Sequence, residues 1–274
     1  MSAAVSASTP RRKLSPRKRA QRLRWGQYAL LVALVTLALL NMNIVQVQHT
    51  FFRPEFIART ITQGLVGALA NTIIYTIGAF VFGLVLGTVL AMMKLSSVGP
   101  YRWLATAYVE LFRGLPAIIV FMAFSLLPLA FPGLRIPFDP MGTVWVALGL
   151  VSGAYMAETI RAGIQAVPKG QVEAARSLGM PSGMAMRKIV LPQAFRIITP
   201  PLTNELILVT KDSSLCYVIG LSATGYELTK YGRDLAVSTA SLTPLVVAGL
   251  SYLIITLPLS AIVRRMEAKA KRAR

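Results

Sequence analysis

The chain has 274 residues, of which 55% are hydrophobic and 14% are charged, and its 29 Lys and Arg against 10 Asp and Glu give a formal net charge of +19. A soluble domain typically has about 25% charged residues, so this composition, with a mean hydropathy of +0.61, excludes a soluble globular, disordered or collagen-like protein. The single Cys216 excludes an intramolecular disulfide, and with His49 as the single histidine the sequence has no His or Cys cluster spaced for a metal site.

The basic residues are concentrated at the two ends of the chain. Residues 11–24 hold eight Lys or Arg, residues 264–274 hold six, and the first acidic residue is Glu55. Such arms can bind nucleic acid, but nucleic-acid-binding domains are not usually connected to several apolar segments. We therefore expect membrane lipid, and no nucleic acid, as the partner of these arms. The Arg- and Ser-rich start also resembles a transit peptide, which leaves that alternative open.

Six segments are long and apolar enough to be considered as membrane-crossing helices, which need roughly 20 residues. In chain order they are residues 28–45, 64–93, 114–131, 143–160, 200–219 and 242–263. The fifth is the most polar, because it contains Asn204, Glu205, Lys211 and Asp212. Together they predict an all-α integral membrane protein with about six transmembrane helices, the first of them uncleaved.

The Lys and Arg content of the short loops indicates the orientation of these helices. With both ends of the chain in the cytoplasm, 23 of the 29 basic residues fall on the cytoplasmic side. We therefore expect a basic cytoplasmic arm at residues 1–27, a first span with an external loop at residues 28–63, and a basic cytoplasmic tail at residues 267–274.

Glycines recur in the second and fourth segments at spacings that allow helices to pack closely. Gly83 and Gly87 form one such pair, and Gly149 and Gly153 form another. We interpret these pairs as sites of helix packing within one chain rather than as a contact with a second copy.

The loop at residues 166–196 is expected to fold into two short helices. Pro168 suits a helix start, and Gly179 can take the left-handed conformation that ends a helix. Ser182 is expected to cap a second helix, which would stop at Pro192. The pattern predicts a compact helix-turn-helix that projects into the cytoplasm.

Part of this loop matches a known signature. The matching residues, at the full spacing of the signature, are Glu173, Ala174, Ala175, Gly179, Ile189, Leu191 and Pro192. They resemble the EAA motif of the inner-membrane permease subunits of binding-protein-dependent ABC importers. The segments ELFRGLP (110–116), AYMAETIRAGI (154–164), VPKGQ (167–171) and KDSSL (211–215) are similar to the polar amino-acid branch of that family. The resemblance covers about residues 71–266, most of the chain.

The resemblance implies a type I ABC importer permease core of five spans at residues 64–266, with one added N-terminal span. It also implies import of polar amino acids by alternating access. In this family the EAA loop docks on the ATP-binding subunit, so Glu173, Ala174, Ala175 and Gly179 are expected to couple the two subunits. The implied partners are two ATP-binding cassette subunits, an extracytoplasmic solute-binding protein, and a second permease that is either a copy or a homologue.

The chain itself is not expected to be an enzyme. It contains no Gly-Lys-Ser or Gly-Lys-Thr, the end of the P-loop that cradles nucleotide phosphates. We therefore expect no cofactor in this chain and expect ATP to be bound by the partner subunits.

Polar residues inside the predicted spans suggest a substrate path. A charge at the centre of a bilayer costs about 2.5–3.5 kcal/mol on insertion scales, so such residues should face a water-filled path or pair with one another. The predicted path residues are Glu158, Lys211, Asp212, Ser213 and Ser214. Lys211 and Asp212 offer both signs of charge to a zwitterionic amino acid. Two structural alternatives remain, namely interhelical pairs for Lys211 and Asp212 and a pair between Glu158 and Arg161.

Two other functional classes account for part of the sequence. An ion-coupled secondary transporter or channel for small polar solutes would explain the charges of Lys211 and Asp212 but not the EAA loop. A membrane anchor or scaffold would explain the basic arms but not the charges within the spans. The sequence leaves open which amino acid is carried.

Overall fold

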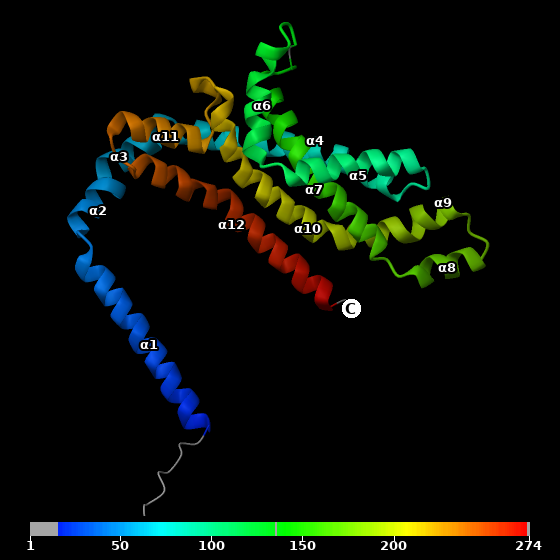
Figure 1. Cartoon of the computed structure of the whole chain (residues 1–274), viewed down its shortest axis with the longest axis horizontal. Helices are drawn as coiled ribbons and strands as arrows, with labels where there is room; N and C mark the ends of the chain where they lie inside the picture. The colour runs from blue at the N-terminus through cyan, green and yellow to red at the C-terminus, as the bar shows by residue number, and fades with distance from the viewer. Residues whose placement is uncertain (1–15, 135, 273–274) are drawn as a thin grey trace, which may run out of the picture. The chain divides into compact units, whose positions relative to one another are not determined.

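The structure, a computed structural model of the whole chain, describes residues 16–134 and 136–272. All the regular secondary structure within these ranges is helical (Figure 1), which confirms the all-α prediction. The chain divides into two units, residues 1–49 and 50–274, which are described separately below.

The first unit contains α1 (Pro16–Asn41) and most of α2 (Ile44–Phe51). Its segment Ala20–Asn41 is long and apolar enough to cross a membrane. The predicted first span extended to residue 45, but the helix ends at Asn41. The backbone N–H of Gln46 donates to Asn43 Oδ1 at 3.0 Å, so Asn43 starts a new helix. Residues 1–15 of the predicted basic arm lie outside the described residues.

The second unit contains the remaining helices. In chain order they are α3 (Pro54–Thr60), η1 (Ile61–Leu65), α4 (Val66–Leu95), α5 (Gly99–Gly114), α6 (Ala117–Ala130), α7 (Met141–Gln165), α8 (Lys169–Ser177), α9 (Ser182–Ala185), η2 (Met186–Val190), α10 (Leu191–Asp212), η3 (Ser213–Ile219), η4 (Ala223–Gly225), α11 (Leu228–Thr239) and α12 (Thr243–Arg272). The α10 helix packs against α7 and α12, and α11 packs along α12.

Four helical segments of the described chain are long and apolar enough to cross a membrane. They are Ala20–Asn41, Ile44–Leu95, Met141–Gln165 and Thr243–Lys269. A fifth is obtained if α5 and α6, which meet at an angle of 102°, count as one bent span. The predicted third span corresponds to α6, which is only 14 residues long. The most polar of the six predicted segments, the fifth, is not among these spans, because α10 carries too many polar residues to be recognised by composition.

The start of the fifth predicted segment was wrong. It was placed at Pro200, but α10 begins at Leu191 and continues through Pro200 and Pro201. Proline removes a backbone donor and is expected to break an isolated helix. Here α10 lies between α7 and α12, and tertiary packing overrides that local preference.

The α4 and α7 helices form the centre of the second unit and pack through glycines. A Cβ added at Gly83 would lie 2.5 Å from Ser152 Oγ, and one added at Gly87 would lie 2.8 Å from the carbonyl oxygen of Gly153. A Cβ at Gly149 would lie 2.4 Å from the ring of Phe82. An added Cβ would require Ser152, Phe82 or the backbone of α7 to shift, and the expected packing of the glycine pairs within one chain is confirmed.

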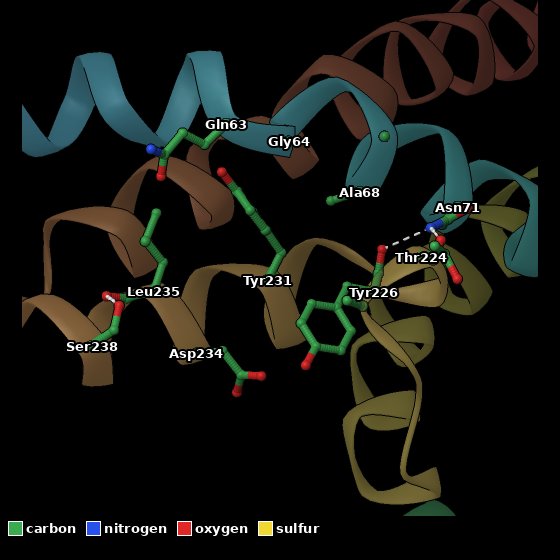
Figure 2. A pocket seen from close by; sticks show the side chains of 12 residues that line it. Gln63, Gly64, Ala68, Asn71, Thr224, Tyr226, Tyr231, Asp234, Leu235 and Ser238 are labelled. Carbon is green, nitrogen blue, oxygen red and sulfur yellow. Dashed lines mark hydrogen bonds between the residues drawn. The ribbon is translucent and has the colours of Figure 1, made fainter.

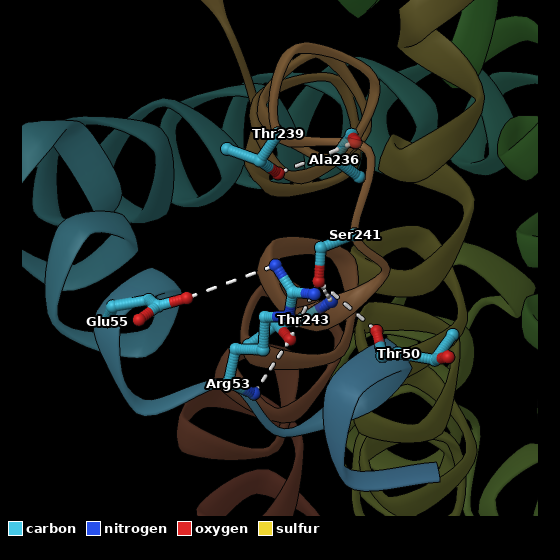
Figure 3. A network of polar contacts seen from close by, with 7 residues as sticks. All are labelled: Thr50, Arg53, Glu55, Ala236, Thr239, Ser241 and Thr243. Atoms are coloured by element: carbon cyan, nitrogen blue, oxygen red, sulfur yellow. Dashed lines mark hydrogen bonds and ion pairs between the residues drawn. The ribbon is translucent and has the colours of Figure 1, made fainter. Parts of the chain in front are cut away.

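The start of α3 is bound to the start of α12 by a polar network (Figure 3). The carbonyl oxygen of Thr50 accepts hydrogen bonds from the backbone N–H of Leu242 at 2.9 Å and from Ser241 Oγ at 3.2 Å. The backbone N–H of Arg53 donates to Thr243 Oγ1 at 3.1 Å. These bonds fix the chain that enters α3 against the N-terminus of the last helix.

Candidate coupling loop and substrate path

The loop predicted at residues 166–196 folds as two short helices joined by a tight turn. Gly179 has a φ of +83°, as predicted for the residue that ends α8. Its N–H donates to the carbonyl of Arg176 at 2.9 Å, and the N–H of Met180 donates to that of Ala175 at 3.1 Å. These two bonds satisfy carbonyls at the end of the helix, as in a Schellman motif.

Two details of the predicted second helix were wrong. Ser182 is the first residue of α9 rather than its cap, since the cap position is Pro181 and no side-chain hydrogen bond caps the helix. The helix also does not end at Pro192, because α9 continues through the π-helical turn η2 into α10. Pro192 lies in the first turn of α10, where its missing N–H breaks the helical hydrogen bonding less than in a helix interior.

The four predicted coupling residues face two directions. Glu173, Ala174 and Gly179 are exposed, whereas Ala175 is buried. Leu178, which lies between them and the turn, is 84% exposed. A hollow of about 580 Å³ beside α8 is lined in part by Glu173. The loop therefore exposes a carboxylate, a small side chain and a leucine along α8 and its turn, while Ala175 is buried.

Glu158 lies between two cations at the end of α7 that leads into this loop. Lys94 Nζ, from the last turn of α4, forms an ion pair with Glu158 Oε1, and Arg161 Nη2 lies 2.7 Å from Glu158 Oε2. Arg161 Nε donates to the same oxygen at 3.0 Å. The pair with Arg161 that the sequence offered as one alternative is present, and the additional pair with Lys94 joins α4 to α7.

The other predicted path residues lie at the junction of α10 and η3. Within the described residues, neither Lys211 nor Asp212 forms an ion pair, so the interhelical pairing weighed for them is not observed. Lys211 is exposed and Asp212 is half-buried. Ser213 is buried and donates to the carbonyl of Thr210 at 2.7 Å, and Ser214 is half-buried.

The predicted path residues therefore fall into two groups. Glu158 belongs to the part of the unit where Ile160 and Ile164 pack against α10. The segment after Lys211 belongs to another cluster, in which Cys216 packs with Tyr75 of α4 and Val144 of α7. The fold keeps Lys211 to Ser214 together at the junction of α10 and η3. Glu158, in contrast, is held in ion pairs on α7.

A cavity of about 470 Å³ lies between the start of α4 and α11 (Figure 2). Many of its polar groups already bind the protein. Asn71 Nδ2 donates to the carbonyls of Thr224 and Tyr226 at 2.9 and 3.0 Å, and Tyr231 Oη donates to the carbonyl of Thr60 at 2.7 Å. Burial raises the pKa of Asp234, but the hydrogen bond and charge of Lys230, helped by Tyr226, outweigh it and lower that pKa overall. Asn71 thus binds α4 to the segment before α11, and Tyr231 binds α11 to α3.

Comparison with known proteins identifies the family. The sequence profile of the binding-protein-dependent transport system inner membrane component matches residues 79–272. The chain belongs to this family. The match begins in α4 and ends in α12, so it contains both the candidate coupling loop and the junction of α10 and η3.

Individual relatives of this permease are transport proteins for amino acids. The arginine transport system permease protein ArtQ of Bacillus subtilis is 40% identical over 205 residues, which cover 74% of this chain and 90% of the relative. The glutamate/aspartate import permease protein GltK of Escherichia coli O157:H7 is 36% identical over 205 residues, with 73% and 90% covered. A chain of a solved amino acid ABC transporter with histidines is 36% identical, superposes with a TM-score of 0.67, and is matched over 75% of this chain and 93% of its own.

These findings confirm the family that the EAA motif and its flanking segments indicated. The permease is a multi-pass protein of the inner membrane, and subunits of this kind work with ATPase and binding-protein partners. The comparisons give no support to an ion-coupled secondary transporter or channel.

Glu227 is a polar residue of the permease that the sequence analysis missed. Its side chain is fully buried, and it caps α11. Burial raises its pKa, although hydrogen bonds from the backbone of Thr229 and Lys230 and from Tyr252 oppose that change. An acidic residue directly before a helical segment is a cap signal, but Glu227 lies outside both the predicted spans and the 166–196 loop, which hold the predicted site residues.

Proposed function

We propose that this permease imports polar amino acids by alternating access, with ATP bound and hydrolysed by two separate ATPase subunits. The observation that carries the proposal is the exposed coupling surface at α8, with Glu173 and Ala174 beside the turn at Gly179. Small side chains allow close docking of a partner, and Glu173 can pair with a cation of the ATPase. The absence of a P-loop ending from the sequence supports the separate supply of ATP.

The proposed assembly contains a second permease, a copy or a homologue, and an extracytoplasmic solute-binding protein. Its core is residues 64–266, with the coupling loop at residues 166–196. Residues 28–63 form an added span and external loop. The basic segments 1–27 and 267–274 lie in the cytoplasm, where their charge meets anionic lipid rather than nucleic acid.

The proposed substrate path includes Lys211, Asp212, Ser213 and Ser214 at the junction of α10 and η3. It also includes Glu158 on α7. Lys211 can meet a substrate carboxylate and Asp212 an ammonium group, while the two serines add hydroxyls. The lack of an ion pair at Lys211 and Asp212 among the described residues supports this role, because unpaired charges at such a position need water or a ligand. Relatives named for arginine and for glutamate and aspartate support amino acids as the substrate class.

Charge reversal at the coupling surface is expected to weaken the complex with the ATPase. Glu173→Lys should reduce co-purification of the ATPase in detergent at least about tenfold, which corresponds to about 1.4 kcal/mol. Gly179→Pro should do the same, because proline fixes φ near −65° and Gly179 requires +83°. Glu267→Lys, an equally exposed charge reversal on α12, is the matched control and should leave the complex intact. Undiminished co-purification of both loop variants would refute the coupling role.

Neutral substitutions in the path are expected to impair uptake more than assembly. Lys211→Met and Asp212→Asn should each lower ATP-dependent uptake of radiolabelled amino acid by about tenfold or more, since each removes a charge-assisted contact worth about 1.5–3 kcal/mol. Glu55→Gln removes an exposed carboxylate and should leave uptake unchanged. Normal uptake by both path variants would reduce the two residues to a structural role.

A further inference from the structure

The end of α4 packs in the part of the unit from which the proposed coupling loop projects. Ala91, in the last turns of α4, is fully buried in a cluster with Ile160 of α7 and with Val167, which lies between α7 and α8. Val190 of η2 and Ala194 of α10 belong to the same cluster. Since Val167 precedes the first helix of the loop and Val190 follows the second, both ends of the loop share one apolar cluster with the end of α4.

A chain of polar contacts also leads from α4 to the end of α7. Lys94 Nζ, from the last turn of α4, forms an ion pair with Glu158 Oε1. Arg161 Nη2 lies 2.7 Å from Glu158 Oε2, and Arg161 Nη1 donates to Gln165 Oε1 at 2.7 Å. Gln165 is the last residue of α7. The contacts therefore begin on α4, cross to α7 at Glu158 and end where the loop starts.

Lys94 is not needed to neutralise Glu158. Arg161 already supplies one positive charge to the carboxylate, because its Nε and Nη2 both donate to Glu158 Oε2, at 3.0 and 2.7 Å. With Lys94 the group contains two cations and one carboxylate, and the side chains of Lys94 and Glu158 are only 12% and 19% exposed. Removing a second cation from water costs free energy. We therefore attribute the presence of Lys94 to the connection that it makes between α4 and α7.

The other end of the chain of contacts reaches the surface of the loop. Gln165 is exposed and, together with Glu173 and Arg176 of α8, lines the hollow beside that helix. Only residues 166–168 connect α7 to α8, and Val167 among them is 5% exposed. A connection so short, with its central residue packed in the interior, transmits a displacement of α8 to the end of α7 instead of absorbing it.

We propose that Lys94 and Arg161 are positioning residues for the coupling of transport to ATP hydrolysis. Through Glu158 and Gln165 they keep α4, α7 and the loop in one arrangement, so that a displacement of the loop by the ATPase moves α4 and α7 together. Glu158 also belongs to the proposed substrate path, so the same contacts connect the ATPase surface with that path. The proposal deepens the proposed function and rests on it, because it requires the ATPase to dock on the loop.

The test uses the complete importer, reconstituted in liposomes with its ATPase and binding protein. The measured ratio is the amino acid imported per ATP hydrolysed, with radiolabelled arginine, glutamine and glutamate as probes. Lys94→Met removes the contact with α4 but leaves Glu158 paired with Arg161, and it should lower this ratio about 3–10-fold, the effect of one lost hydrogen bond. Lys94→Arg retains a cation and should keep the ratio near that of the unchanged importer. Lys230→Met is the matched control, because the ion pair of Lys230 with Asp234 at 2.8 Å lies within α11, and it should leave the ratio unchanged.

The ratio separates positioning from stability, because a smaller amount of assembled importer lowers uptake and ATP hydrolysis in proportion. Gln165→Met removes the other end of the chain of contacts. If both ends act through Glu158, combining it with Lys94→Met should lower the ratio no further than the more severe single variant does. Losses that multiply in the double variant, or an unchanged ratio in the assembled Lys94→Met importer, would overturn the proposal.

Two further outcomes are distinguishable from these. Failure of Lys94→Met to assemble, when Lys230→Met assembles, would assign Lys94 to folding and also overturn the proposal. Absence of ATP-dependent uptake by the unchanged importer would instead refute the proposed function.

Discussion

Replacing Gly87 by alanine is expected to destabilise the permease by about 1–3 kcal/mol, the usual cost of overpacking a close-packed interior. The new Cβ would lie 2.8 Å from the carbonyl oxygen of Gly153 and 2.9 Å from Met156 Cβ, both on α7. These atoms belong to the backbone and to the base of a side chain, so neither can rotate away. The helices must separate, and the midpoint of thermal unfolding in detergent should fall.

Gly67 provides the matched control for this experiment. It lies in the same helix, but an added Cβ would meet nothing within 4 Å. Gly67→Ala should therefore stabilise the protein slightly, by about 0.4–1 kcal/mol, because alanine restricts the unfolded chain more than glycine does. Equal shifts of the unfolding midpoint in the two variants would show that the close approach of α4 and α7 does not limit stability.

Neutralising Glu158 is expected to have an effect of similar size. In Glu158→Gln the cations Lys94 and Arg161 would remain close together without the carboxylate between them. Breaking a fully buried pair costs about 3–5 kcal/mol. The side chains of Lys94 and Glu158 retain 12% and 19% exposure, so water screens part of the repulsion and we expect about 1–3 kcal/mol in the free energy of unfolding.

A second substitution tests the origin of this loss. Lys94→Met together with Glu158→Gln removes the unpaired lysine, and the double variant should recover part of the stability lost by Glu158→Gln alone. Glu55→Gln is the exposed control, because Glu55 lies 3.9 Å from Arg53 with 69% of its side chain exposed, and it should change stability by less than about 1 kcal/mol. If the double variant lost as much stability as Glu158→Gln and Lys94→Met lose in total when made separately, the result would contradict an interaction between Lys94 and Glu158.

The two short helices and the turn at residues 166–196 could be predicted from the sequence, apart from the cap at Ser182 and the end at Pro192. The left-handed turn at Gly179 follows from a local preference of glycine, and the spacing of the EAA residues is a property of a short segment. The error at Pro192 has a local cause as well. A proline can end one helix or lie in the first turn of the next, and the neighbouring residues do not distinguish these two positions.

The polar residues of the helices were less predictable. For Glu158 the sequence suggested Arg161 as a partner, because the two lie one turn apart, but it gave no indication of Lys94, which is 64 residues away. Glu227 was missed for the same reason. Its burial depends on Tyr252 of α12 and on the segment that α4 holds in place, and none of these contacts is visible in the residues next to it.

The sequence by itself determined the class of this protein, its family and the helix-turn-helix of residues 166–196. Apolar length, the distribution of Lys and Arg and the spacing of a motif are properties of contiguous residues, which can be read without knowing which helices meet. Only the tertiary structure decided that Glu158 is held in ion pairs with Lys94 and Arg161, that Lys211 and Asp212 form no interhelical ion pair among the described residues, and that a carboxylate is buried beside Tyr252. Each of these facts depends on distances between helices far apart in the chain, and those distances are set by the packing of the whole unit.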